Sequence, residues 1–145
     1  MNSTIVACSA CGAKNRIANN KRHLTAKCGK CGNRLPALAG VVELDDQNFQ
    51  EIVSNSALPV LVDFFSPTCG PCRSLAPIID QLAGQYAGRA VICKLDTSRH
   101  QMSAGRFQIR GVPTLIFFKN GQQVDQVVGA VPAQELEQRL NRLVS

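Results

Sequence analysis

The sequence predicts an α/β domain, with a central mixed sheet and helices on both faces, that follows a small cysteine-rich N-terminal domain. From residue 41 onward, apolar β-branched runs alternate with segments whose apolar residues recur at helical spacing. Before that point the chain has no comparable apolar core, and it holds four of its 7 cysteines as two CxxC pairs. We therefore expect two domains, at residues 1–40 and 41–145, with residues 33–40 as a linker.

The first predicted elements of the larger domain are a short strand, VVEL, and a helix that carries Phe49, Ile52 and Val53 on one face. Asp45 precedes this helix and is expected to cap it. The run PVLVDFF follows, and its composition is typical of a strand that is buried on both faces. Asp63 interrupts this run, where an uncompensated carboxylate is costly.

A helix is predicted from Gly70, because apolar residues recur at helical spacing over residues 75–86. The stretch AVICKLD predicts a second central strand, and TSRHQMSAGRF predicts a helix with a polar face. The stretch TLIFFKNGQQVDQVVG predicts two strands that are joined by a tight turn at Asn120 and Gly121. Pro132 is expected to open a last amphipathic helix.

The N-terminal cysteines have the spacing of a four-thiolate zinc site. Cys8 and Cys11 form the first CxxC pair, and Cys28 and Cys31 form the second. A glycine follows each pair, where a tight turn often requires positive φ. Residues 1–40 therefore predict a zinc-ribbon-like domain whose folding free energy comes from one structural zinc ion. Two disulfides are the alternative, which the missing export signal disfavours.

The excess of positive charge lies entirely in this segment. Residues 1–40 hold seven Lys or Arg and no Asp or Glu, and these cations can offset the negative charge of a four-thiolate site. The segment has no aromatic residue on which a base could stack, so we do not expect nucleic acid as a partner. His23 is expected at the surface, because four cysteines already complete the ligand set.

The chain shows neither a signal-peptide core near its start nor a run long enough to span a membrane. We therefore expect a soluble cytoplasmic protein without a membrane partner. In a reducing cytosol, cysteines at short spacings are more often metal ligands or redox catalysts than a disulfide framework.

The stretch SPTCGPCRS lies between the predicted buried strand and the next helix. Cys69 would stand at the N-terminus of that helix, where free backbone N–H groups stabilise a thiolate, so it is the candidate nucleophile. Cys72 lies within reach of a disulfide and is the candidate resolving cysteine. A metal site would lack further ligands, and a structural disulfide across so short a loop would stabilise the fold little. Cys93 is expected to be a buried core thiol.

The stretches VDFF, CGPCRSLAP, KLD, GVPTLIFFKNG and VVGAVP occur in this chain in the order of the thioredoxin family, which residues 41–145 resemble. With its N-terminal CxxC pairs, the whole chain resembles the zinc-containing bacterial thioredoxin 2 branch. The resemblance implies the thioredoxin fold and the reduction of protein disulfides through the CGPC dithiol. It also implies an NADPH-dependent thioredoxin reductase as the partner that restores the dithiol. The chain has no dinucleotide fingerprint, so we expect no bound organic cofactor.

The resemblance further implies roles for individual residues. Asp63 would be a buried carboxylate that takes a proton from Cys72, assisted by Lys94. Val112 and Pro113 would form a cis peptide whose backbone pairs with a substrate strand, with an ordinary trans proline as the alternative. The substrate-docking residues would be Thr68, Gly70, Pro71, Val112, Pro113, Gly129 and Ala130. Glycine at position 129 can equally serve the turn before the last helix.

The chain departs from the family in having no tryptophan. Phe65 and Thr68 stand where the family usually has that residue, which predicts a different substrate preference. Two other functions remain open at this point. The first is a nucleic-acid-binding zinc ribbon with a thioredoxin-like adaptor domain, which the intact CxxC pair disfavours. The second is a zinc site that senses oxidation by releasing its metal.

Overall fold

The computed structural model describes residues 3–8, 10–18, 27–33 and 41–144. His23 and most of the linker expected over residues 33–40 lie outside the described residues. Among the described residues, no helix is both long and apolar enough to cross a membrane.

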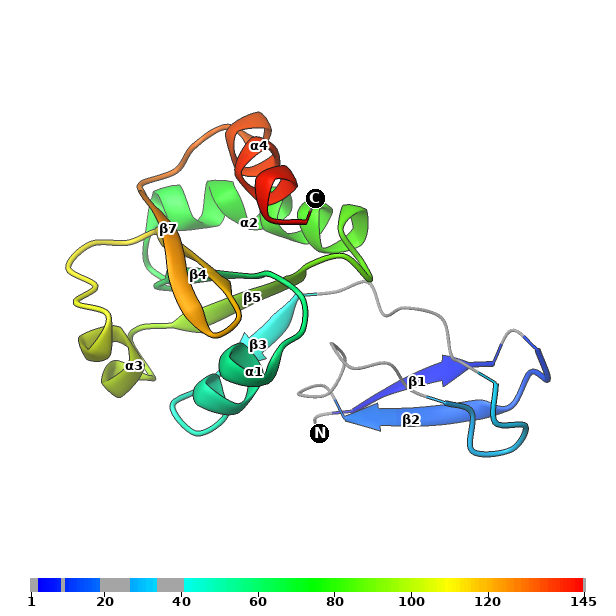
Figure 1. The fold of residues 1–145 in the computed structure, drawn as a ribbon. Coiled ribbons are helices and arrows are strands. Elements are labelled where there is room, and N and C mark those ends of the chain that lie inside the picture. Colours follow the sequence, from blue (N-terminus) through cyan, green and yellow to red (C-terminus); the bar gives the residue numbers. More distant parts are fainter. Residues whose placement is uncertain (1–2, 9, 19–26, 34–40, 145) are drawn as a thin grey trace.

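The larger part of the chain is a five-stranded sheet between two layers of helices (Figure 1). The strands are β3 (Val42–Leu44), β4 (Val60–Phe65), β5 (Val91–Asp96), β6 (Thr114–Lys119) and β7 (Gln122–Val128). They lie in the order β3-β5-β4-β6-β7. β3 and β4 run parallel to β5, whereas β6 runs antiparallel to both β4 and β7. The predicted mixed sheet with helices on both faces is therefore confirmed.

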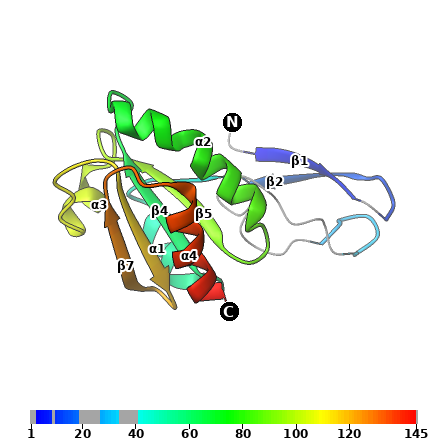
Figure 2. The same cartoon turned by 90° about the horizontal axis from the view of Figure 1, so that it is seen from above.

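The two faces of the sheet are covered by different helices. Helices α1 (Phe49–Asn55) and α3 (Gln101–Arg106) lie on one side, and α2 (Gly70–Gln85) and α4 (Ala133–Val144) lie on the other (Figures 1 and 2). This arrangement explains why β4 is apolar except for Asp63, since a strand buried on both faces has no side that favours polar residues.

Side chains of β4 alternate between two separate cores. Val60, Val62 and Phe64 belong to the core beneath α1, which also holds a cluster of phenylalanine rings. Leu61 belongs to the core beneath α2 and α4. Asp63, two residues further, lies on the same side as Leu61 because strand side chains alternate.

Two boundaries differ from the sequence-based expectation. Helix α1 begins at Phe49, and Asp45 caps the turn before it: its Oδ1 accepts hydrogen bonds from the N–H groups of Gln47 and Asn48 at 2.8 and 2.6 Å. Helix α3 has only 6 residues, because the segment after β5 first forms a turn in which the N–H of His100 donates to the Asp96 carbonyl at 3.0 Å.

The predicted hairpin between β6 and β7 is confirmed. Asn120 and Gly121 both have positive φ, 55° and 78°, and Lys119 pairs with Gln122 across the turn. Positive φ at both central residues is the requirement of a type I′ turn, which matches the twist of the flanking strands.

The N-terminal part contains two strands that the sequence analysis did not predict. β1 (Ser3–Ala7) and β2 (Lys14–Ala18) form an antiparallel pair in which Ile5 lies opposite Arg16. Both strands are short and lack a clear apolar alternation, which is the signal that would have predicted them.

We expect Gly121→Ala to destabilise the fold and Gly84→Ala to stabilise it. At Gly121 a Cβ would lie 3.3 Å from the Ser54 Cα, and an L-residue with φ of +78° is itself strained. We expect a loss of about 1–2 kcal/mol in the free energy of unfolding. Gly84 lies inside α2 with no atom near an added Cβ, so alanine should add about 0.5–1 kcal/mol. Urea unfolding of both variants checks this, and equal midpoints would contradict it.

Candidate functional site

Cys69 and Cys72 form a disulfide at the junction of β4 and α2, with their Cα atoms 5.2 Å apart. Cys69 is the N-cap residue of α2 and has an extended backbone, and the N–H of Cys72 donates to its Sγ at 3.2 Å. Cys69 is half-buried, whereas Cys72 is only 4% exposed. An incoming group can therefore reach the Cys69 sulfur more easily, and a thiolate there would be stabilised by the helix N-terminus.

The segment before β6 lies against this disulfide. Because β6 is antiparallel to β4, its start meets the end of β4 at one edge of the sheet. The peptide between Val112 and Pro113 is cis, as the resemblance implied, and the Val112 carbonyl oxygen lies 3.6 Å from the Cys69 Sγ. In the reduced protein the Cys69 thiol can donate to this carbonyl.

The other residues expected to contact substrates gather around Cys69. Four of them are exposed: Thr68, Gly70, Pro71 and Ala130. Gly129 joins this group because its N–H donates to the Pro113 carbonyl at 2.8 Å. Its φ is +95°, and no atom lies within 4 Å of an added Cβ. The positive φ, and not a lack of space, therefore explains why glycine occupies this position.

Asp63 is buried beneath α2, with 4% of its surface exposed. Its Oδ1 has no hydrogen-bond partner among the described residues. Burial raises the pKa of Asp63 from 3.8 to about 7, although the nearby Lys94 ammonium lowers it. A carboxyl group in this environment exchanges its proton near neutral pH.

Asp63 and Cys72 line the same cavity, which has a volume of about 90 Å³. Its lining includes Asp63, Cys72, Lys94 and Asp80. Lys94 also lies 3.6 Å from a carboxylate oxygen of Glu43 on the edge strand β3. The sequence analysis missed both Glu43 and Asp80, because neither forms part of a motif.

Cys93 has no place in this site. It is fully buried and belongs to the core on the α1 side of the sheet, opposite the disulfide. Burial raises the pKa of its thiol, so this sulfur remains protonated and unreactive. Its predicted role as a core thiol is confirmed.

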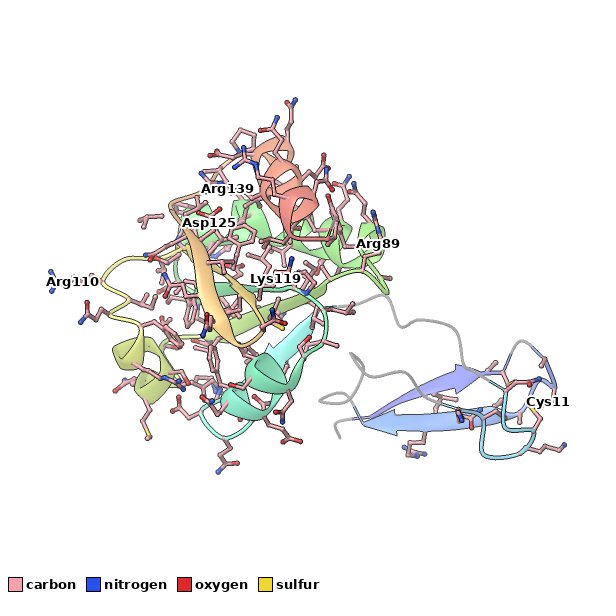
Figure 3. The ribbon with its side chains drawn as sticks, in the orientation of Figure 1. Cys11, Arg89, Arg110, Lys119, Asp125 and Arg139 are labelled. Atoms are coloured by element: carbon pink, nitrogen blue, oxygen red, sulfur yellow. A yellow bond between two sulfur atoms is a disulfide. The ribbon has the colours of Figure 1, made fainter. Side chains whose placement is uncertain are left out.

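A second cluster consists of Cys8, Cys11, Cys28 and Cys31, whose sulfur atoms all lie within 4.8 Å of one another. Figure 3 shows Cys11 at the end of the β1–β2 hairpin. The Sγ atoms of Cys8 and Cys31 are 3.6 Å apart, and those of Cys11 and Cys28 are 3.7 Å apart. Each close contact therefore joins the two CxxC pairs to each other.

The two CxxC pairs have the same backbone geometry. The N–H of Gly12 donates to the Cys8 carbonyl at 2.8 Å, and that of Gly32 donates to the Cys28 carbonyl at 2.9 Å. Gly12 and Gly32 have φ of 76° and 78°, so the predicted positive φ at both glycines is confirmed. These tight turns direct both sulfurs of a pair toward the same point.

Backbone N–H groups favour thiolates in this cluster. The N–H groups of Cys31 and Lys30, followed by the Asn15 side chain, lower the pKa of Cys28 to about 6. The N–H groups of Cys11 and Ala10 lower the pKa of Cys8. The N–H of Ala13 lowers the pKa of Cys11, but burial and the neighbouring sulfurs together outweigh it and raise that pKa to about 12. Low pKa values at Cys8 and Cys28 suit metal ligands, which bind as thiolates.

Asn15 is a further residue that the sequence analysis missed. It lies on β2, its Nδ2 donates to the Cys28 Sγ at 3.5 Å, and its Oδ1 accepts from the N–H of Gly29 at 3.0 Å. It thereby connects the first hairpin to the second CxxC pair. In the sequence, the only sign of this role was a polar residue shortly after the turn of the first CxxC pair.

The cluster fits a tetrahedral metal ion. Zn–S bonds of about 2.3 Å place the sulfurs of a tetrahedron about 3.8 Å apart, close to the two distances observed between the pairs. A disulfide requires a separation of about 2.05 Å, and all four cysteines are free thiols. The donor set therefore favours a metal over the alternative of two disulfides.

Comparison with known proteins gives consistent matches. The family model described as Thioredoxin matches residues 40–142. A thioredoxin from Synechocystis sp. is 45% identical over 105 residues, which cover 72% of this chain and 98% of that protein. Thioredoxin C-3 from Corynebacterium nephridii is 38% identical over 138 residues, 95% of this chain and 94% of its own, so this similarity extends into the N-terminal segment. A mutant thioredoxin from Halobacterium salinarum NRC-1, a solved structure, has a TM-score of 0.69 at 30% identity and covers 74% of this chain and 93% of that chain.

We expect Asp63→Asn to stabilise the oxidised protein at pH 8 but not at pH 4. Because the pKa of Asp63 is raised to about 7, the folded protein holds a proton between about pH 4 and pH 7 that the unfolded chain releases. Stability should therefore fall as pH rises through this range, and the uncharged amide should remove this loss. We expect a gain of about 2–4 kcal/mol at pH 8.

Urea unfolding at the two pH values measures this effect. Asp80→Asn is the matched control, because Asp80 lines the same cavity but is exposed. It should change stability by less than about 0.5 kcal/mol. A gain from Asp63→Asn that is the same at both pH values would contradict the expectation.

Proposed function

The chain belongs to the thioredoxin family, and from this premise we propose that it reduces protein disulfides through Cys69 and Cys72. Members of the family are protein-disulfide oxidoreductases, so thiol-disulfide exchange is the activity of this chain. The observation that carries the proposal is the disulfide at the N-terminus of α2, with its more accessible sulfur on Cys69.

The proposed reaction begins at Cys69. Its thiolate attacks one sulfur of a substrate disulfide, and the second substrate sulfur leaves as a thiolate that takes up a proton. The thiolate of Cys72 then attacks the Cys69 sulfur in the mixed disulfide and releases the first substrate sulfur. Two electrons and two protons pass to the substrate, and the protein ends with the Cys69–Cys72 disulfide.

Asp63 is proposed to accept the proton of Cys72 before the second attack. Both groups line the same cavity, and a pKa of about 7 allows the carboxylate to act as a base at neutral pH. Lys94 is proposed to assist, because its positive charge stabilises the ionised carboxylate. Glu43 forms an ion pair with the Lys94 ammonium and thus weakens the stabilisation of the Asp63 carboxylate by Lys94.

Substrates are proposed to dock along the backbone of Val112. The Val112 carbonyl already lies beside Cys69, and its N–H has no partner among the described residues. An extended substrate segment can therefore pair there as an added strand. The proposed contact surface is completed by Thr68, Gly70, Pro71, Pro113, Gly129 and Ala130. The small, exposed Thr68 is proposed to give a substrate preference different from that of tryptophan-bearing relatives.

An NADPH-dependent thioredoxin reductase is proposed to restore the dithiol after each cycle. The cytoplasm is the proposed compartment, because its reducing conditions keep the dithiol and the four N-terminal thiols reduced.

The four N-terminal cysteines are proposed to hold one structural zinc ion, as in the thioredoxin 2 branch. Four protein ligands fill a tetrahedron and leave no position for water, so the ion would support folding and not catalysis. Exposed Lys14, Lys27 and Lys30 offset the negative charge of the site. Residues 1–40 and 41–145 are proposed as two domains, which agrees with their two separate sheets.

We expect Cys69→Ser to abolish the reduction of a protein disulfide and Cys72→Ser to accumulate a mixed disulfide. Without the Cys69 thiolate no attack occurs, whereas without Cys72 the first step proceeds and the second cannot. NADPH consumption with thioredoxin reductase measures turnover, and mass spectrometry after acid quenching detects the adduct. Cys93→Ser is the control and should retain activity. Residual turnover in Cys69→Ser above the rate without protein would refute the assignment of the nucleophile.

We expect the full chain to bind one zinc ion and Cys28→Ser to lose it. Removing one ligand opens the tetrahedron and leaves residues 3–33 without their source of folding free energy. Zinc content by mass spectrometry and amide hydrogen exchange check both effects, and protection within residues 41–144 should persist. Cys93→Ser should keep its zinc. Full zinc content in Cys28→Ser would show that the four-cysteine site is assigned wrongly.

A further inference from the structure

The loops around the disulfide share one edge of the sheet. The ends of β4, β5 and β7 and the start of β6 meet there, because β5 is parallel to β4 and the β6–β7 pair is antiparallel. The loop after β5 is joined to the end of β4 by the N–H of Thr97, which donates to the Phe65 carbonyl at 2.9 Å. Charges on these loops therefore act on any substrate that approaches Cys69.

Three arginines are exposed at this edge: Arg99 and Arg110 on the loops, and Arg73 in the first turn of α2. None of their guanidinium groups has a carboxylate partner among the described residues. The one carboxylate at the ends of these strands, that of Asp96, accepts hydrogen bonds from the N–H and the hydroxyl of Ser98 at 2.9 and 2.6 Å. Three arginines against the one carboxylate at these strand ends leave the edge near the disulfide with a net positive charge.

Two of these arginines belong to segments that lie next to the Cys69 sulfur. The Nε of Arg73 donates to the Pro67 carbonyl at 3.2 Å, which holds its guanidinium beside the loop that leads to Cys69. Arg110 lies two residues before Val112, whose carbonyl oxygen is 3.6 Å from the Cys69 Sγ. Figure 3 shows its side chain projecting from the domain into solvent.

One exposed acid, Asp80, lines the cavity beside Cys72, about two turns along α2 from Arg73. Two further acids lie at the far end of the same edge. Asp45 and Asp46 follow β3, which β5 separates from β4. Their carboxylates accept hydrogen bonds from backbone N–H groups, those of Asn48 at 2.6 Å and Ser103 at 2.8 Å. Among the described residues, neither these two carboxylates nor that of Asp80 forms an ion pair with Arg73 or Arg110, so both guanidinium groups remain available to a substrate.

We propose that Arg73 and Arg110 direct this protein toward disulfides that are flanked by aspartate or glutamate in the substrate chain. This inference rests on the proposed function and adds the class of substrate. Guanidinium groups bind carboxylates in a bidentate geometry, and unpaired charges near a reaction site raise association rates by about 10- to 1,000-fold. The effect belongs to the encounter step, so added salt should remove it.

The test compares three synthetic peptides that share one cystine loop. The flanking residues are glutamate, lysine or serine, and each peptide is mixed with the fully reduced, zinc-loaded chain. Acid quenching followed by chromatography gives the second-order rate constant of reduction. No reductase is present, so only the exchange between protein and peptide is measured.

We expect the acidic peptide to react at least about 10-fold faster than the basic peptide at an ionic strength of about 0.01 M, where the Debye length is about 30 Å. Near 1 M, where that length is about 3 Å, the two rates should agree within about 2-fold. Arg110→Gln, and more strongly Arg73→Gln combined with Arg110→Gln, should lower the low-salt ratio at least about 3-fold.

Lys119→Gln is the matched control. It removes one positive charge at the β6–β7 turn, on the opposite edge of the sheet, and should leave the ratio within about 1.5-fold of its original value. Using the ratio of two peptides also cancels any effect of the arginines on the reactivity of the Cys69 thiolate.

The possible results distinguish failure of the proposed function from failure of the proposed substrate class. Failure to reduce even the serine-flanked peptide would refute the proposed function. Normal reduction of that peptide with an acidic-to-basic ratio near 1 would refute only the substrate class. An equal drop of the ratio in Lys119→Gln and Arg110→Gln would assign the preference to the net charge of the chain, and would overturn the role of the two arginines.

Discussion

The central position of β4 is the constraint on which the rest of the site depends. This strand pairs with β5 on one side and with β6 on the other. Helices cover both of its faces, so both faces are buried. The same placement buries Asp63 opposite Lys94 and Leu115. Because the strand ends at the edge where α2 begins, it also brings Cys69 to a helix N-terminus. One buried strand thus positions both the nucleophile and the proposed base.

The two ionisable groups at this junction lie in opposite electrostatic environments. Cys69 caps α2, where backbone N–H groups favour a negative charge, whereas Asp63 lies in an apolar core that disfavours one. The Asp63 carboxyl group and the Cys72 sulfur both line a cavity of about 90 Å³. The helix N-terminus therefore favours a thiolate at Cys69 in the reduced protein, while the interior favours the protonated form of Asp63.

The N-terminal cluster solves a different physical problem. A segment this short cannot bury enough apolar surface to fold alone, and its described buried residues are only Cys8 and Cys28. Two similar turns direct four sulfurs to one point, and Asn15 ties the hairpin to the second turn through Cys28 and Gly29. A metal ion bound there would replace the missing core.

The sequence by itself determined the fold class, the hairpin at Asn120 and Gly121, and the spacing of both cysteine clusters, because apolar periodicity and local turn chemistry act over a few residues. It did not determine strands β1 and β2, the start of α1 at Phe49, or the contacts of Asn15 and Glu43, because these depend on partners that are distant in the chain. Only the tertiary structure decided which sulfur is accessible, how deeply Asp63 is buried, and that the segment of Arg110 and Val112 lies beside Cys69. The reason is that burial and electrostatic potential are sums over neighbours, and the neighbours of a residue are set by sheet order and not by sequence distance.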